Sequence, residues 1–299
     1  MRFLQIVIIS TQVTHGGATP IDFVKTRMQL VPELGSKGLF GATKEIIASE
    51  GAGALTTGMS ATAAAYALQG SFKFGGFEFF KVNLAQAYGD QGAWDNRFLL
   101  NSISAACAEF IADIFLSPLD STRIRKVSDA EMASMSMPQA FGTILKRDGF
   151  ITGFYSGFVP LLFKQIPYTI AKFVVQDEVA NRIYRGLDAK PAETSKGTKL
   201  GISLASGTVA GVAAAICSHP ADTLFSLMNK PGAGGEGGMM SRMATIAGEM
   251  GFYKLATQGL GARCIMIGGL TAGQFAIFDS MLPAIGIDKF HYHEPHAEH

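Results

Sequence analysis

The sequence predicts an all-α membrane protein built from three similar repeats, and two features lead to this prediction. Only 16% of the 299 residues are charged and 48% are hydrophobic, whereas about 25% of residues are charged in a typical soluble domain. A motif of proline and aspartate also recurs at intervals of about one hundred residues. The 35 glycines favour helices that pack in lipid, where small residues let backbones approach closely. In water, glycine costs a helix about 1 kcal/mol per position, so a soluble helical protein is the less favoured alternative.

Composition also argues against several classes of function. The net charge of +1 gives no basic field for a nucleic-acid partner. The three cysteines, Cys107, Cys217 and Cys264, are too scattered for a disulfide framework or a CxxC metal site. We find no spacing of nucleophile and base, or of metal ligands, and therefore expect no enzymatic activity, no cofactor and no resident metal. The apolar start of the chain lacks the basic region of a secretory signal.

Each repeat contains a motif that reads Pro, any residue, Asp, two residues, base, any residue, base. It occurs at Pro20–Arg27 and Pro118–Arg125, and in altered form at Pro220–Leu227. A loop, a short amphipathic segment and a second apolar stretch follow each copy. Internal recurrence at a fixed period indicates one structural unit per copy. We therefore predict three repeats, at 1–85, 96–186 and 198–284, and a polar tail at 285–299.

The second apolar stretches of the repeats align without gaps. Gly58, Gly157 and Gly259 each precede an acid by twenty residues. An acid or a methionine followed by glycine lies just upstream, at 50–51, 148–149 and 250–251. Each repeat therefore predicts a long helix, a short surface helix and a second long helix. Most long segments carry a few polar residues, which in membrane spans usually face the bundle interior or a water-filled cavity. We expect six spans around a polar pathway.

The triple motif at this period resembles the signature of the mitochondrial carrier family, and the resemblance covers nearly the whole chain. It implies six tilted transmembrane helices with threefold pseudosymmetry and a short matrix-side surface helix in each repeat. It also implies one central substrate site, a place in the mitochondrial inner membrane, and both termini on the intermembrane-space side. The expected partners are membrane lipids, with cardiolipin as a candidate, and the expected state is a monomer.

The proline motif predicts a gate at the inner, matrix side. Proline removes a backbone hydrogen bond and kinks a helix, and the acids and bases that follow can pair around the ring of helix ends. The resemblance implies the pairs Asp22 with Arg123, Asp222 with Lys25, and Asp120 with a base from the third repeat. Phe225 stands at the position of that base, so we expect one link of the inner gate to be missing.

A second gate is expected at the outer side, where the family uses an aromatic residue, an acid, two residues and a base. Glu78 and Lys81 fit this motif. The copies at Asp177 and Asp279 have Ala180 and Leu282 in place of the base. We therefore expect the outer network of ion pairs to be thin.

Several segments resemble the phosphate-transporting branch of the family, among them Gln69–Gly76, Phe163–Phe173 and Ser218–Asp222. Lys73 and Lys172 lie at the same offset from their repeat glycines, and Gln274 is the third equivalent. Cations in a cavity of low dielectric attract an anion, and lysine and arginine suit phosphate oxygens. The expected phosphate ligands are Lys73, Lys164, Gln165, Lys172, Arg263 and Thr26. The alternative is that the long cationic side chains extend to the membrane interface.

Phosphate symport also needs groups that bind protons. Glu109 and Asp113 lie four residues apart and therefore on one helix face, and His15 can titrate near neutral pH. Acids within a span cost several kcal/mol unless paired, protonated or hydrated. We therefore expect a proton relay through His15, Glu109 and Asp113, serving proton symport or the equivalent hydroxide antiport. The alternative is a capping histidine and hydrogen-bonded buried acids. The third repeat instead carries the close-packing pattern Gly207-x-x-x-Gly211.

Three functions remain open at this point. The first is transport of inorganic phosphate with protons by alternating access. The second is transport of another anion, or of a metal such as copper. The third is a scaffold or pore that does not transport. A histidine-rich end, with histidines at 291, 293, 296 and 299, leaves a metal-binding tail as an alternative to a simple polar one.

Overall fold

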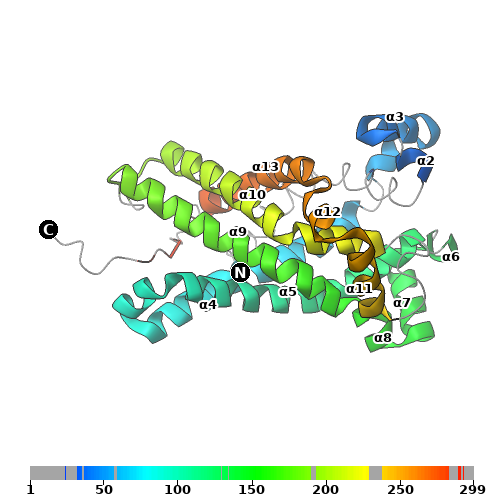
Figure 1. The fold of residues 1–299 in the computed structure, drawn as a ribbon, viewed down its shortest axis with the longest axis horizontal. Coiled ribbons are helices and arrows are strands. Elements are labelled where there is room, and N and C mark those ends of the chain that lie inside the picture. Colours follow the sequence, from blue (N-terminus) through cyan, green and yellow to red (C-terminus); the bar gives the residue numbers. More distant parts are fainter. Residues whose placement is uncertain are drawn as a thin grey trace.

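The computed structural model describes residues 24, 32–35, 37–56, 59–128, 130–133, 135–189, 193–228, 238–282, 289–290 and 292. All regular elements within these ranges are helices, and the long ones lie side by side in one bundle (Figure 1). The long helices are α4 (Met59–Asp95), α5 (Arg97–Ser128), α9 (Phe158–Gly186), α10 (Lys196–Met228) and α13 (Leu260–Met281). The predicted first span falls outside the described residues, apart from Val24.

Short helices recur between the long ones. They are α2 (Pro32–Gly35), α3 (Gly38–Glu50), the 3-10 helix η1 (Ala52–Thr56), α6 (Ala130–Ala133), α7 (Met137–Asp148), α8 (Phe150–Tyr155), α11 (Met239–Met250) and α12 (Phe252–Thr257). The helices α3, α7 and α11 end in the same way, at Gly51, Gly149 and Gly251. The φ angles there are 83°, 77° and 75°, a backbone region that glycine enters at no steric cost. The aligned glycines of the sequence therefore mark three equivalent helix ends.

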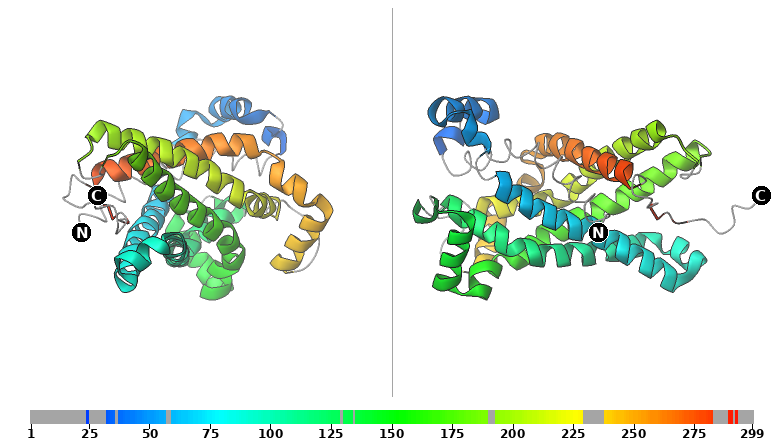
Figure 2. Two further views of the ribbon diagram at one scale, coloured as in Figure 1. Left: turned by 60° about the vertical axis from the view of Figure 1, so that its left-hand side comes forward. Right: turned by 180° about the vertical axis from the view of Figure 1, so that it is seen from behind.

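The two ends of the bundle differ. The helices α3, α7 and α11 gather at one end, and the described part of the C-terminal segment lies at the other (Figure 2). We call these the inner and the outer end, following the orientation that the family resemblance implies. At the inner end, Arg125 in the last turn of α5 donates to Asp148 of α7. That hydrogen bond lowers the pKa of the Asp148 carboxyl below its usual 3.8, so the contact between these helices persists at neutral pH.

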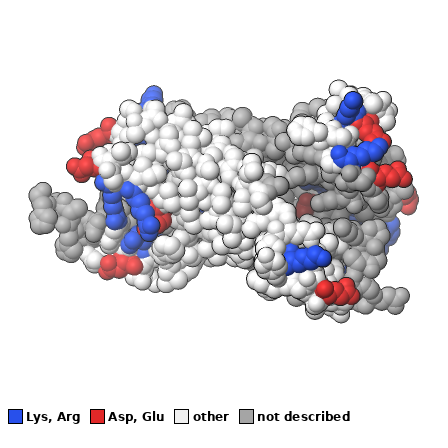
Figure 3. Space-filling model, turned by 45° about the horizontal axis from the view of Figure 1, so that its top comes forward, with Lys and Arg blue, Asp and Glu red and all other residues white. Residues whose placement is uncertain are grey.

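Within the described residues, three segments are long and apolar enough to cross a membrane: Arg97–Lys126, Phe150–Gly186 and Lys196–Leu227. The surface agrees with this, because the charged side chains on the face drawn in Figure 3 lie near the two ends and leave an uncharged band between them. Large apolar side chains such as Phe115 and Ile216 are exposed on α5 and α10. Such a surface would be a liability in water and is what a lipid-facing helix requires.

The helices α10 and α13 approach each other very closely. A Cβ atom at Gly207 would lie 2.8 Å from the Cα of Ala272, and one at Gly211 would lie 2.6 Å from the carbonyl oxygen of Ile267. Neither position can therefore hold a side chain without separating the helices. The close packing predicted from the Gly-x-x-x-Gly pattern is confirmed.

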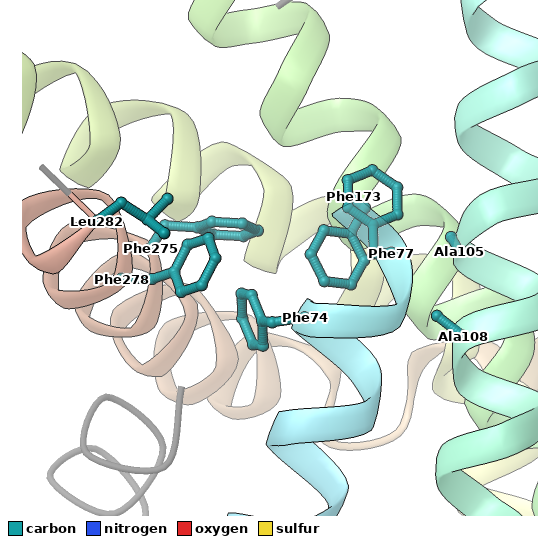
Figure 4. Close-up of a cluster of buried hydrophobic side chains, with 8 residues drawn as sticks. All are labelled: Phe74, Phe77, Ala105, Ala108, Phe173, Phe275, Phe278 and Leu282. Carbon is teal, nitrogen blue, oxygen red and sulfur yellow. The ribbon is translucent and has the colours of Figure 1, made fainter. Parts of the chain in front are cut away.

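Three phenylalanines from equivalent repeat positions close the centre of the bundle. Phe74, Phe173 and Phe275 lie on α4, α9 and α13, and each comes sixteen residues after its repeat glycine. Their ring centroids are 5.1, 5.6 and 5.7 Å apart, so the rings form a nearly equilateral triangle (Figure 4). We call these three residues the aromatic layer. They belong to a buried cluster completed by Phe77, Ala105, Ala108, Phe278 and Leu282.

Candidate functional site

Two buried lysines lie on the inner side of the aromatic layer. Lys73 on α4 and Lys172 on α9 are 7% and 2% exposed. The Lys73 Nζ lies 2.9 Å from Glu109 Oε2, and Lys172 Nζ donates to Gln274 Oε1. Both side chains therefore turn into the bundle and do not extend to the membrane interface. The equivalent positions Lys172 and Gln274 are in direct contact.

Aromatic rings surround the two ammonium groups. The Lys172 Nζ lies 4.9 Å from the ring centroid of Phe74 and 5.5 Å from that of Phe275. The ring of Tyr168 lies near both ammonium groups, 5.7 Å from Lys73 Nζ and 6.0 Å from Lys172 Nζ. Cations over aromatic faces gain a modest attraction that grows when water is excluded. Two rings of the aromatic layer therefore lie directly against the cationic site.

Two fully buried acids of α5 lie beside this site. Thr169 Oγ1 donates to Glu109 Oε2 over 2.7 Å. Glu109 Oε1 and both carboxyl oxygens of Asp113 have no hydrogen-bond donor among the described residues. Burial of a carboxylate without donors is costly, so these oxygens form a place where a proton or a ligand donor is favoured. Thr169 was missed by the sequence analysis, since a threonine within an apolar span carries no signal of its own.

A second charged group lies nearer the inner end. Arg263 donates to Asp222 and, through Nη2, to Ser218 Oγ over 2.9 Å. The Lys164 Nζ lies 3.8 Å from Asp222 Oδ1 and 4.7 Å from the ring centroid of Phe225. The phenylalanine that replaces the expected base thus presents its ring to a lysine. The Asp222 side chain is 28% exposed, so exposure increases from the aromatic layer towards the inner end.

Other predicted residues are placed less completely. Asp120 and Arg123 are half-buried in the last turns of α5, and Gln165 is half-buried on α9. The predicted residues outside the described ranges are His15, Asp22, Lys25 and Thr26. The expected pairs Asp22–Arg123 and Asp222–Lys25 therefore stay predictions, and the described partners of Asp222 are Arg263 and Lys164.

The outer end holds its own network of charges. The fully buried Lys81 lies 3.0 Å from Asp177 Oδ1, and Asn101 Nδ2 donates to the other oxygen of that carboxylate over 2.9 Å. Glu78 is half-buried on α4 and interacts electrostatically with Lys81. This part of the outer end was predicted from the family motif.

A second lysine at the outer end was not predicted. The Nζ of Lys289 lies 3.2 Å from Asp279 Oδ1 and donates to Gln176 Oε1 over 3.1 Å. Ser203 Oγ donates to the other oxygen of Asp279 over 2.6 Å. The described part of the outer end therefore contains, besides Lys81, a base that lies outside the three motif copies. The repeat pattern gave no signal for Lys289, because this residue follows the last helix.

Comparison with known proteins bears on the whole chain. The family model described as mitochondrial carrier protein matches residues 6–88, 95–187 and 196–287. These three matches fall on the three copies of the repeat and leave little of the chain unmatched.

Relatives also align over most of their length. The chain is 42% identical over 282 residues to mitochondrial substrate carrier family protein N of Dictyostelium discoideum, covering 93% of this chain and 92% of that protein. It is 38% identical over 283 residues to the mitochondrial phosphate carrier protein of Caenorhabditis elegans, covering 94% and 80%. It is 36% identical over 275 residues to solute carrier family 25 member 3 of Homo sapiens, covering 92% and 73%.

The helices, the repeats and these matches confirm the predicted all-α membrane fold of three repeats. Members of the matched family are transporters and not enzymes. The chain therefore belongs to the mitochondrial carrier family and is a multi-pass protein of the mitochondrial inner membrane.

Proposed function

We propose that this protein transports inorganic phosphate across the mitochondrial inner membrane by alternating access. Relatives named as phosphate carriers, from Caenorhabditis elegans and Schizosaccharomyces pombe, are 38% and 37% identical over more than nine-tenths of the chain. The observation that carries the proposal is the environment of Lys172. Its ammonium is buried against the neutral Gln274, and no carboxylate among the described residues lies within ion-pair distance. A buried cation with a neutral partner favours the binding of an anion.

Phosphate would meet two groups of ligands in turn. Arg263 and Lys164 lie nearer the inner end and are partly exposed, so they receive the anion first. Lys172 and Lys73 lie deeper, beneath the aromatic layer, and bind it at the centre of the bundle. Gln165 and Thr26 remain proposed ligands of the same path. The final position excludes water, which strengthens the attraction between the ammonium groups and the phosphate.

Proton coupling follows from the ion pair between Lys73 and Glu109. When Glu109 is ionised, its carboxylate holds the Lys73 ammonium at 2.9 Å and competes with phosphate for it. Protonation of Glu109 releases Lys73 to the anion. A proton and a phosphate therefore favour each other's binding, and this mutual effect is necessarily reciprocal. Asp113 lies one turn away with two oxygens that no described donor reaches, and we assign it, with His15, to the path of the proton.

The charged networks would act as gates at the two ends. Lys81 and Asp177 close the outer end together with the aromatic layer, while Asp222, Arg263 and Lys164 occupy the inner end. Together with Asp22, Lys25, Asp120, Arg123 and Glu78, these residues form the proposed gate set. The pair of Lys164 and Asp222 at the inner end is partly exposed. Such partly hydrated ion pairs suit a gate, because they are worth about 0–1 kcal/mol each and can exchange partners at modest cost.

The proposal includes a single chain as the working unit. One chain carries all three repeats, which suits a monomer as the working unit. We place the repeats at 1–85, 96–186 and 198–284, surrounded by membrane lipids that include cardiolipin.

Uptake by proteoliposomes that contain the purified protein tests the function. We expect phosphate uptake to rise when the exterior is made acidic, because the proton gradient then drives symport. Lys172→Gln should reduce uptake at least about tenfold, since a buried interaction with a charged group is worth about 1.5–3 kcal/mol. Lys254→Gln, at an exposed lysine of α12, is the matched control and should transport normally.

Two results would contradict the proposal. Folded protein without phosphate flux would move the substrate to another anion or a metal, or would favour a scaffold. Unchanged uptake by the Lys172→Gln variant would remove this lysine from the site.

A further inference from the structure

The outer end contains more carboxylates than its helices can pair. Glu78, Asp177 and Asp279 come from equivalent repeat positions. The described helices contribute one lysine to them, Lys81, which pairs with Asp177 at 3.0 Å. Leu282, at the third-repeat position of a base, is buried with an apolar side chain. The Asp279 side chain is only 16% exposed. A cation from outside the helical repeat would therefore stabilise its carboxylate, because a charge shielded from water is costly unless it is paired.

Lys289 provides that cation. Its Nζ lies 3.2 Å from Asp279 Oδ1 on α13 and 3.1 Å from Gln176 Oε1 on α9. The same ammonium lies 5.5 Å from the ring centroid of Phe275. Lys172 lies 5.5 Å from this ring as well, so one phenylalanine of the aromatic layer contacts a cation of the central site and a cation of the outer end. Lys289 thus links two repeats at the boundary of the closed centre.

The neighbours of Lys289 extend this link to the other helices. Lys81 Nζ donates to the carbonyl oxygen of Phe290 over 3.1 Å. Tyr292 is 6% exposed, and its hydroxyl donates to Asn101 Oδ1 over 3.3 Å. We call Lys289, Phe290 and Tyr292 the C-terminal latch. It contacts α4, α5, α9 and α13 at the outer end, so those contacts must break before a solute can pass.

We propose that Lys289 is the missing third-repeat base of the outer gate, and that the C-terminal latch withdraws from the bundle each time the outer end opens. The gate would then depend on a segment that lies beyond the repeats. This inference rests on the alternating access proposed above, but not on which anion is carried.

The charge of Lys289 is stable over the range in which transport is measured. Burial alone would lower the pKa of Lys289, but the carboxylates of Asp279, Asp177 and Glu78 outweigh burial and raise this pKa. The latch therefore remains cationic at neutral and mildly alkaline pH. Its release is driven by the solute and the conformational change, and not by deprotonation of the lysine.

Access to a cysteine beneath the aromatic layer tests the latch. Gln69→Cys lies one turn before Lys73 and is buried in the closed structure. The three native cysteines are replaced by serine, and intact mitochondria carrying the full-length protein receive a membrane-impermeant thiol reagent from the outer side. We expect Lys289→Gln to increase the labelling rate about fivefold or more, the change that corresponds to one partly buried ion pair. Lys289→Arg keeps the charge and should label at the background rate.

The controls separate gating from folding. Lys196→Gln removes an exposed lysine at the same end of the bundle, at the start of α10, and should leave labelling unchanged. Asp279→Asn breaks the same ion pair from the helix side and should increase labelling as Lys289→Gln does, which keeps the test valid if Lys289→Gln fails to fold. Exchange of the charges, Asp279→Lys with Lys289→Asp, should restore slow labelling.

Two outcomes would overturn the inference: background labelling in both Lys289→Gln and Asp279→Asn, or an equal increase in Lys289→Arg. Because labelling needs no phosphate flux, the gate and the substrate are judged separately. The protein with Gln69→Cys and no native cysteine is also assayed for phosphate uptake. If it labels as expected but carries no phosphate, the proposed function is contradicted and the inference about the latch stands.

Discussion

Two equivalent lysines have partners of different charge, and this difference gives them different tasks. Lys73 pairs with the carboxylate of Glu109, whereas Lys172 contacts the neutral amide of Gln274. In the proposed mechanism, the first ammonium is available to an anion only after its carboxylate is protonated. The second has no carboxylate within ion-pair distance among the described residues. We therefore propose that anion binding and proton binding meet at the ion pair of Lys73 and Glu109.

Glu109→Gln tests this division at the residue scale. Glutamine resembles the protonated acid, so Lys73 would be permanently released. We expect exchange of phosphate for phosphate to continue. An acidic exterior should no longer stimulate uptake, so that the uptake rate with a gradient is about equal to the rate without one, because coupling is lost. The ratio of the two rates in proteoliposomes measures the effect. Glu249→Gln, at an exposed position of α11, is the control, and a variant that retains full stimulation would exclude Glu109 as the coupling group.

At the scale of elements, α10 and α13 pack closely together at glycine positions. Gly211 meets the backbone of Ile267 and Gly268, with no space for a methyl group. Counted back from Asp222 and Asp120, Gly211 and Ala215 stand at the positions that Glu109 and Asp113 hold in α5. The third repeat thus contributes mechanical contact where the second contributes titratable groups.

Gly211→Ala should therefore destabilise the protein. A Cβ 2.6 Å from the Ile267 carbonyl oxygen forces the helices apart, and such overpacking typically costs about 1–3 kcal/mol. Thermal unfolding of the purified protein should occur at a lower temperature. Gly201→Ala is the matched control on the same helix, because its Cβ would meet nothing within 4 Å. Equal melting temperatures for Gly211→Ala and the parent would show that the helices can separate freely.

At the scale of the whole molecule, the aromatic layer separates the central site from the outer end. Phe173 stacks on Phe77 at 4.2 Å and meets Phe74 edge to face at 5.1 Å. Phe173→Ala removes one of the three rings of the aromatic layer. Loss of a buried phenylalanine side chain typically lowers the free energy of unfolding by about 3–5 kcal/mol. We expect a pH gradient across vesicles to decay several-fold faster without phosphate. Phe163→Ala, at an exposed phenylalanine of the same helix, is the control and should leave the decay of the gradient unchanged. An unchanged decay in Phe173→Ala would show that the aromatic layer is not a barrier.

Much of this arrangement could be predicted from the repeat. Counting from aligned glycines places Lys73, Lys172 and Gln274 at equivalent positions, and threefold symmetry then brings equivalent residues to the centre. The same counting cannot find Lys289, because this lysine lies beyond the last repeat and acts through a contact distant in the sequence. It also cannot find the pairing of Asp222 with Arg263, since a kinked helix end offers several bases within reach.

The glycine contact between α10 and α13 has a consequence for how the molecule moves. Two helices whose backbones touch cannot slide or rotate against each other without a clash, so the third repeat is expected to tilt as one rigid block. The hinges must then lie at its borders. On one border α9 faces α10, where Gln176 approaches Ser206. In such a transport cycle the three repeats would tilt against one another as rigid bodies, and the third repeat would be the most rigid of them.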